Sequence, residues 1–399
     1  MVAGATSSPA SGVAAFPHSD INLFADESLR DPFGDYRRLR DLGPVVKLER
    51  PDVYAVSRFD DVRDALRASD VLKSGEGVGF SDTFNSVKGN NVLQSDGEQH
   101  KRMRGAVMRP LKPGHLDGAR PQFKAMVVQR VAELVGAGEF DAMEKLARFL
   151  PVEAIAHLVG LEPEGRERML EWAAATFNLI GPDQDPNDLK SLGGARDYMR
   201  GLSAAKVRPE SWASQLFQAA DEGAISPVEA IGAISAYIVP SLDTTIFAKG
   251  SLLLNLAANP DQWDRLCRRP ELIPSAVLEG VRHSSVIRWF SRVAAVDYRI
   301  ADWVIPAGSR MMLLYGSANR DERHYPEPDR FDVERNPRDH LAWGRGEHMC
   351  AGLHLARMEM EVMLEALVES GCTLHAGTPV VGTNRGLYGL SALPYRLAH

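Results

Sequence analysis

The chain has 399 residues, of which 44% are hydrophobic and 25% are charged, and its formal net charge is -7. This composition indicates an ordinary globular protein, and the acidic balance argues against nucleic acid as the main partner. Cys267, Cys350 and Cys372 are too few and too widely spaced for a disulfide framework, which leaves room for one functional thiolate.

The first twenty residues lack the basic start and apolar stretch of a secretory signal, and apolar runs such as MMLLYG are too short to cross a bilayer. We therefore expect a cytoplasmic monomer without a membrane span. Residues 1–20 are predicted to form a disordered leader, and residues 21–399 a single domain.

The predicted elements begin with two short strands, PVVKLE at 44–49 and VYAVSRF at 53–59, and a helix, DDVRDALRAS at 60–69. From 98 to 275 the patterns are mainly helical. They include a helix at 121–138 that ends in glycines and a helix at 226–260 long enough to cross the core. Short strands return between 298 and 319, around a turn at Pro306–Gly308. The fold class is mainly α with small β-sheets.

The long helix contains the sequence VPSLDTT at 239–245. Pro240 has no amide hydrogen, so a helix that continues through it must kink and leave the carbonyl of Ala236 unpaired. The adjacent Asp243 and Thr244 could hold water and pass protons at this polar notch. A proline kink followed by an exposed polar turn is the simpler alternative.

Cys350 lies between glycines at 344, 346 and 352, directly before an amphipathic helix. The glycines allow tight turns and the close approach of a flat partner, and backbone amides at a helix start stabilise a thiolate. A cysteine presented in this way can ligate haem iron. A buried structural cysteine is one alternative.

Zinc is another alternative, because His340, His348, Cys350 and His354 are close in sequence. Their spacing does not match the usual paired zinc ligands, and only one cysteine is present among them. A zinc-stabilised helical binding protein is therefore the less favoured reading.

Six stretches of the sequence, in order, resemble the cytochrome P450 monooxygenases, from about residue 30 to the end of the chain. WGRGEHMCAG at 343–352 resembles the haem-binding loop of that family, and LDTT resembles its oxygen-activating helix. The other four are DPFGDYRRLRDLGPV at 31–45, GEQHKRMR at 97–104, EGVR at 279–282 and EPDRFDVER at 327–335. The resemblance implies the cytochrome P450 fold, a haem b cofactor and monooxygenase activity.

The resemblance also assigns roles to residues. Cys350 would be the axial iron ligand, with Trp343 in place of the usual phenylalanine beside it. The haem propionates would be held by His100, Arg104, Arg292 and His348. Asp243 and Thr244 would supply protons for dioxygen activation, although Pro240-Ser241 replaces the usual Ala-Gly before them.

A supporting ion-pair set is also implied. Glu279 and Arg282 would pair with Arg335 or Arg330, and the sequence does not decide between these two arginines. Ser285 stands where the family commonly has a proline.

Several short stretches are similar to bacterial members that oxidise small aromatics, so the expected reaction is hydroxylation or O-demethylation of a methoxyphenol or para-substituted benzoate. The sequence offers no arginine in the helix stretch 235–239 or in the loop around Lys88, and an unpaired buried carboxylate is costly, which favours a neutral phenol. Terpenoid or other secondary-metabolite oxidation, and a peroxide-using haem enzyme, remain alternatives. The substrate-pocket candidates are Phe80, Phe84, Val87, Leu93, Phe177, Val239, Leu242, Val286 and Ile287.

The chain has no flavin, nicotinamide or iron–sulfur module of its own, so electrons are expected from an iron–sulfur ferredoxin and its NAD(P)H-dependent reductase. Dioxygen is the co-substrate. A basic patch on the cysteine side of the haem could receive the ferredoxin, with Arg102, Arg109, Lys112, Arg345 and Arg357 as its candidates.

Overall fold

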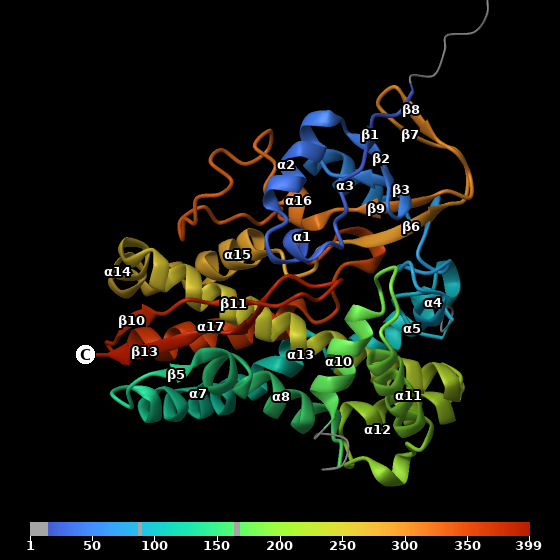
Figure 1. Cartoon of the computed structure of the whole chain (residues 1–399). Coiled ribbons are helices and arrows are strands. Elements are labelled where there is room, and N and C mark those ends of the chain that lie inside the picture. The colour runs from blue at the N-terminus through green and yellow to red at the C-terminus, as the bar shows by residue number, and fades with distance from the viewer. Residues whose placement is uncertain (1–14, 87–89, 163–167) are drawn as a thin grey trace, which may run out of the picture.

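The computed structural model describes residues 15–86, 90–162 and 168–399. Figure 1 shows a helix-rich part below a smaller part that contains the largest sheet. The described helices are α1 (Asp26–Arg30), α2 (Phe33–Leu42), α3 (Phe59–Arg67), α4 (Asp82–Asn85), α5 (Gly97–Met108), α6 (Pro113–Leu116), α7 (Arg120–Leu134), α8 (Phe149–Val159), α10 (Met169–Asn178), α11 (Pro186–Arg200), α12 (Trp212–Asp221), α13 (Pro227–Ala258), α14 (Pro260–Arg268), α15 (Ile273–Ser284), α16 (Tyr315–Ala318) and α17 (Leu353–Glu369).

The strands form four small sheets within these described ranges. The largest has the order β1-β2-β3-β9-β6-β4, and the others are β10-β13-β5, β11-β12 and β7-β8. Their bounds are β1 (His18–Ser19), β2 (Val45–Glu49), β3 (Asp52–Val56), β4 (Leu72–Lys73), β5 (Phe140–Asp141), β6 (Phe290–Ala294), β7 (Tyr298–Ile300), β8 (Trp303–Ile305), β9 (Arg310–Leu313), β10 (Thr373–Ala376), β11 (Val380–Val381), β12 (Leu390–Ala392) and β13 (Pro394–Ala398). The predicted mainly α fold class is confirmed.

The predicted long helix is α13, and its start follows from local sequence. The Ser226 hydroxyl accepts from the backbone N–H of Glu229, whose carboxylate accepts from the N–H of Ser226, so two of the free N–H groups at the helix start are satisfied. Pro227 occupies the first turn, where its missing N–H costs nothing. The helix continues through Pro240 to Ala258.

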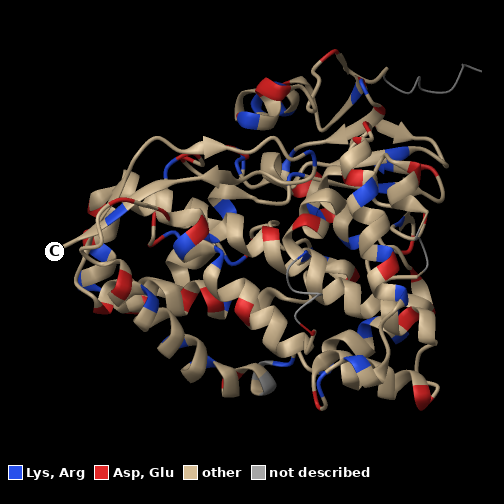
Figure 2. Ribbon diagram, turned by 60° about the horizontal axis from the view of Figure 1, so that its bottom comes forward, with Lys and Arg blue, Asp and Glu red and all other residues tan. Residues whose placement is uncertain are grey.

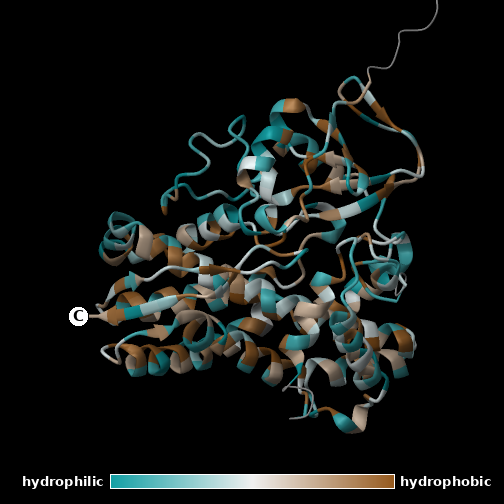
Figure 3. Ribbon diagram, viewed as in Figure 1, coloured by the Kyte–Doolittle hydropathy of each residue, from teal (hydrophilic) through white to brown (hydrophobic). Residues whose placement is uncertain are grey.

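The central position of α13 gives the fold its core. It packs against α8, α10, α12 and α15, and Figure 1 shows it crossing the middle of the molecule. By length and composition α13 could cross a bilayer, contrary to the expectation that every apolar run is too short, but half of its most apolar window is buried inside the fold. Polar and apolar residues are mixed along the surrounding helices in Figure 3, as expected for helices that bury one side only.

The predicted elements near the N-terminus are confirmed as β2, β3 and α3, whereas the predicted boundary of the leader is wrong. His18 and Ser19 form β1, which pairs in parallel with Lys47 and Leu48 of β2. The backbone N–H of Lys47 also donates to the carbonyl of Pro17. The ordered part therefore begins before residue 21, and the first fourteen residues lie outside the described ranges.

Candidate active site

A cavity of about 720 Å³ lies between α13, α10, α11 and the loop that carries Cys350. This volume is within the range of small-molecule sites. Six of the predicted pocket residues line it: Phe84, Leu93, Phe177, Val239, Val286 and Ile287. The cavity is therefore lined by side chains from segments that are far apart in the sequence.

The loop around Cys350 is held by its own backbone. The N–H of Cys350 donates to the carbonyl of Trp343 at 2.8 Å, and the Trp343 ring lines the cavity. Gly346 has a φ of +74°, and a Cβ added there would lie 2.6 Å from the carbonyl oxygen of Leu66. Both observations require glycine at this position, so the loop has room to approach α3 only because of it.

Cys350 stands directly before α17, as predicted. Burial raises the pKa of its thiol, whereas hydrogen bonds from the backbone N–H groups of Gly352 and Leu353, together with the positive charge of Arg104, lower it. The amide donors are those expected to stabilise a thiolate, and a bound metal ion deprotonates a ligating thiol outright. The position therefore suits a metal-ligating thiolate that is exposed to the cavity.

The four residues predicted to hold carboxylates come together as one group, here called the His–Arg cluster: His100, Arg104, Arg292 and His348. All but His100 line the cavity. The rings of His100 and His348 lie 4.3 Å apart, and Arg104 donates to the carbonyl of Met349 at 2.6 Å. Burial, followed by the charges of His348 and Arg104, lowers the pKa of His100 to about 4, so its imidazole is neutral at pH 7.

The cluster contains buried donors without acceptors. His100 is 2% exposed, and neither of its ring nitrogens has a hydrogen-bond partner within the described residues. The Nε2 atom of His348 also lacks a hydrogen bond there, with the nearest Asp96 oxygen 3.7 Å away. Because buried polar groups are normally paired, these atoms fit a cofactor that brings acceptors such as the two propionates of haem.

The predicted acid–alcohol pair is divided between two sides of α13. Thr244 lines the cavity and its hydroxyl donates to the carbonyl of Pro240 at 2.5 Å. Asp243 is 7% exposed and does not line the cavity, so the prediction that both groups face one notch is wrong for the acid. Burial raises the pKa of Asp243 to about 7, against the opposing charge of Arg148. Thr245, which the sequence analysis missed, lines the cavity.

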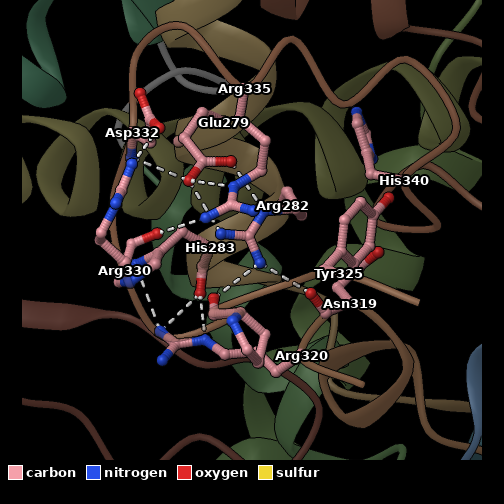
Figure 4. A network of polar contacts seen from close by, with 12 residues as sticks. Glu279, Arg282, His283, Asn319, Arg320, Tyr325, Arg330, Asp332, Arg335 and His340 are labelled. Carbon is pink, nitrogen blue, oxygen red and sulfur yellow. Dashed lines mark hydrogen bonds and ion pairs between the residues drawn. The ribbon is translucent and has the colours of Figure 1, made fainter. Parts of the chain in front are cut away.

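The structure also decides which arginine joins Glu279 and Arg282. Arg282 donates to both Glu279 oxygens, at 2.7 and 2.8 Å, and Arg335 donates to Glu279 at 3.2 Å (Figure 4). Arg330 instead pairs with Asp332 and with Glu327, at the surface. Arg335 therefore completes the set, and the Arg330 alternative is wrong.

Ser285, which follows this set at the end of α15, has a φ of +44°. Proline cannot adopt this conformation, because its ring fixes φ near -65°. The departure from the family pattern at this position therefore agrees with the local backbone.

Two pocket candidates fall elsewhere, and a third is not described. Phe80 packs against Phe24 and Trp289, and Leu242 is fully buried on another side of α13; neither lines the cavity. Val87 lies outside the described residues, as does Lys88. Whether a residue of α13 meets the cavity depends on how the helix is rotated in the fold, which a stretch of apolar residues does not encode.

Sequence reasoning also missed two arginines. The preference for a neutral phenol rested on the absence of an arginine from residues 235–239 and from the loop around Lys88. Arg196 and Arg200 of α11 line the cavity from another segment, so that argument was incomplete. No motif marks these residues. The only signal available was their helical spacing, and this indicates a shared face without identifying what the face contacts.

The geometry does not favour the zinc alternative. Within residues 15–86, 90–162 and 168–399, no group of three or more His, Cys, Asp or Glu side chains could hold a metal ion. His340 is buried against Trp343, with ring centroids 4.8 Å apart, whereas His354 is exposed at the start of α17.

The predicted basic patch is partly neutralised within the chain. Arg102 pairs with Glu229, and Arg357 with Glu361 at 3.1 Å. Arg345 donates to the carbonyl of Arg338. Figure 2 shows acidic and basic residues interspersed over the ribbon, so charge alone does not outline one docking face.

Comparisons with known proteins agree with the site. Residues 257–370 match the family model described as Cytochrome P450. The chain is 32% identical over 401 residues to cytochrome P450 CYP199A2 of Rhodopseudomonas palustris, covering 98% of this chain and 96% of that protein. It is 33% identical over 388 residues to a beta-dihydromenaquinone-9 omega-hydroxylase of Mycobacterium tuberculosis, covering 94% of this chain and 78% of that protein.

Solved structures give the same result for the fold. Epothilone D-bound cytochrome P450epoK has a TM-score of 0.86 at 25% identity, covering 96% of this chain and 100% of that one. The P450 enzyme CxnD has a TM-score of 0.84 at 26% identity, covering 97% and 98%. With the cysteine loop and the His–Arg cluster in place, these matches show that the chain belongs to the cytochrome P450 family of monooxygenases, which bind haem b through a cysteine thiolate.

Proposed function

We propose that this P450 monooxygenase hydroxylates or O-demethylates a small aromatic substrate of the methoxyphenol or para-substituted benzoate type. The observation that carries the proposal is the aromatic part of the cavity lining, to which Phe84, Phe177, Phe290, Trp172 and Trp212 contribute. Flat apolar side chains pack well against an aromatic ring, and edge-to-face contacts add to the burial of apolar area.

When bound, the haem would supply the activation of dioxygen, and residues of the chain would hold the haem in position. Cys350 would hold the iron, and the His–Arg cluster would bind the propionates by charge-assisted hydrogen bonds. Thr244 and Thr245 keep hydroxyl groups on the cavity wall, where they would hold water for proton transfer. Asp243 lies on another side of α13, where burial raises its pKa to about 7, so this carboxyl can hold a proton at neutral pH.

O-demethylation balances in two steps. One oxygen atom of dioxygen enters a C–H bond of the methyl group, while two electrons and two protons convert the other atom to water. The resulting hemiacetal then breaks its bond between the methyl carbon and the ether oxygen, giving a phenol and formaldehyde.

The electrons are proposed to come from an iron–sulfur ferredoxin and its NAD(P)H-dependent reductase. Arg109 and Lys112, between α5 and α6, are exposed, and no ion pair with another described residue is found for either. Unpaired surface cations steer an acidic partner toward its docking face. Charge reversal at both residues should slow reduction by an acidic ferredoxin and weaken its salt dependence.

A larger apolar substrate is the second candidate. One relative at 33% identity is named as an omega-hydroxylase of beta-dihydromenaquinone-9, which indicates that this sequence neighbourhood includes enzymes of long substrates. A titration of the ferric holoprotein with 4-methoxyphenol, 4-methoxybenzoate, a monoterpene and a menaquinone separates the two candidates. A saturable spin-state shift with the aromatics, and formaldehyde equal to substrate consumed, would support the proposal; shifts with the isoprenoids alone would reject it.

The peroxide-using alternative is tested separately. A monooxygenase that draws on Thr244 should lose coupled product formation in Thr244→Ala, whereas turnover with peroxide alone, undiminished in that variant, would favour a peroxide-using enzyme.

A further inference from the structure

Helix α11 presents one stripe of residues to the cavity: Leu192, Ala195, Arg196, Met199 and Arg200. The spacing of three and four residues places all five on one side of the helix. Three of them are apolar, as expected for the wall of a pocket. Two are arginines, so α11 brings positive charge to a wall that is otherwise largely apolar.

The two arginines differ in their contacts. Arg200 pairs with Asp197 at 3.1 Å, and both side chains are more than three-quarters exposed. Arg196 is half-buried and donates only to neutral acceptors, the carbonyl of Thr83 and the hydroxyl of Ser86, both at 3.1 Å. No carboxylate of the described chain lies within ion-pair distance of Arg196, and its Nε and second terminal nitrogen make no hydrogen bond there.

Within the described parts of the chain, the charge of Arg196 has no counter-ion. Burial, together with the neighbouring charge of Arg200, lowers its pKa, which indicates that the positive form is not fully compensated. A half-buried guanidinium with free donors is the side chain best suited to bind a planar carboxylate with two parallel hydrogen bonds.

The arginines at the other end of the cavity already have a proposed role in binding the haem propionates. In the proposed haem site, the positive charges of Arg104 and Arg292, which both line the cavity, would be matched by the two propionates. Among the described arginines of the cavity wall, Arg200 pairs with Asp197, and Arg104 and Arg292 would be matched by the propionates, so Arg196 is left with neither an acidic partner nor a propionate.

We propose that Arg196 binds the carboxylate of the substrate, and that the substrate is therefore an apolar acid whose charged end lies at α11 and whose oxidised end lies toward Cys350. This inference rests on the proposed monooxygenase function and narrows its substrate class to acids. Arg196 is then the residue that sets the preference for an acid over a neutral analogue.

The test compares acids with their uncharged amides of the same shape. Two pairs are used: 4-methoxybenzoate with 4-methoxybenzamide, and dodecanoate with dodecanamide. Binding to the ferric holoprotein is measured by calorimetry, so that a ligand without a spin-state change is still counted. The wild type should bind at least one acid about 10- to 100-fold more tightly than its amide, the factor expected for hydrogen bonds between charged groups.

Variants separate anion binding from a structural role. Arg196→Gln should remove the acid preference while changing amide affinity less than about 3-fold, and Arg196→Lys should keep part of it. Ser86→Ala removes a hydrogen bond of Arg196 without removing its charge, so it should retain the preference. The carbon monoxide spectrum of each variant reports whether the thiolate-ligated haem is intact.

The outcomes distinguish this inference from the proposed function. An arginine-dependent preference for dodecanoate, with no binding of either aromatic, would support the inference and reject the aromatic substrate. Aromatic binding with no acid preference, or with a preference that survives in Arg196→Gln, would overturn the inference and leave the aromatic proposal standing. Absence of an acid preference in both pairs would also overturn it.

Discussion

Replacing Arg335 should destabilise the protein far more than replacing Arg330, although both lie in the same segment. Arg335 is 14% exposed and donates four hydrogen bonds, to Glu279 at 3.2 Å and to the carbonyls of Pro326, Glu327 and Arg330 at 2.8 to 3.1 Å. At about 0.5–1.5 kcal/mol for each bond, their loss costs about 2–6 kcal/mol.

The lower half of that range is expected, because Glu279 does not become an unpaired buried charge. It keeps two hydrogen bonds from Arg282 and one from the backbone N–H of Asp332, at 3.0 Å. We therefore expect Arg335→Gln to cost about 3 kcal/mol. Arg330 is 57% exposed, and its surface ion pairs are worth about 0–1 kcal/mol, so Arg330→Gln is the matched control.

Urea unfolding of the holoprotein at pH 7.5, followed by far-ultraviolet circular dichroism, measures both variants against the wild type. The midpoint should fall clearly for Arg335→Gln and remain near the wild-type value for Arg330→Gln. Equal losses in the two variants, or a larger loss for Arg330→Gln, would refute the assignment of Arg335 to the buried set.

Three further predictions concern α13 and its neighbours. Thr244→Val should leave substrate affinity unchanged but raise peroxide formed per NAD(P)H and lower product, because the cavity hydroxyl is lost; unchanged coupling would contradict this. Because the pKa of Asp243 is raised to about 7 in the folded state, this carboxyl keeps its proton between pH 4 and 7, whereas in the unfolded state it is ionised in that range. The free energy of unfolding should therefore fall by up to about 4 kcal/mol as the pH rises from 4 to 7. Asp243→Asn should remove this dependence, which urea unfolding at several pH values checks. Lys249 is fully buried and faces the charge of Glu359, and burial lowers the pKa of Lys249 to about 8 and raises that of Glu359 to about 7. Lys249→Met should therefore lower the free energy of unfolding by about 3–5 kcal/mol at pH 8, where Glu359 loses its counter-charge, and by less at pH 6. The double variant Lys249→Met with Glu359→Leu should recover most of this loss. Equal stability of the single and double variants at pH 8 would contradict the pairing.

The sequence alone was sufficient to predict features that arise from contacts between residues close together in the chain. Ser226 and Glu229 cap each other across one turn, so the start of α13 can be read without any knowledge of the fold. Glu279 and Arg282 are three residues apart on one helix, so their pairing also follows from spacing. The glycines around Cys350 likewise indicate a loop that lies close to the backbone of another segment.

The same reasoning failed where an outcome depends on the packing of distant segments. Asp243 and Thr244 are adjacent, yet the rotation of α13 within the bundle places the hydroxyl at the cavity and the carboxylate on another side. Phe80 is apolar like Phe84, but only Phe84 meets the cavity, because Phe80 packs against Trp289. Periodicity identifies a face of an element and not the surface that it meets.

The sequence by itself therefore determined the family and the long helix, and it predicted the iron ligand and the kinds of residue that would hold the cofactor, because ordered motifs and short-range spacing encode them. Only the tertiary structure decided that Arg335 joins Glu279, that Asp243 turns away from the cavity and that Arg196 reaches its wall. Each of these depends on contacts between residues 50 to more than 100 positions apart, as between Arg335 and Glu279 or between Arg196 and Thr83, and no local pattern constrains such contacts.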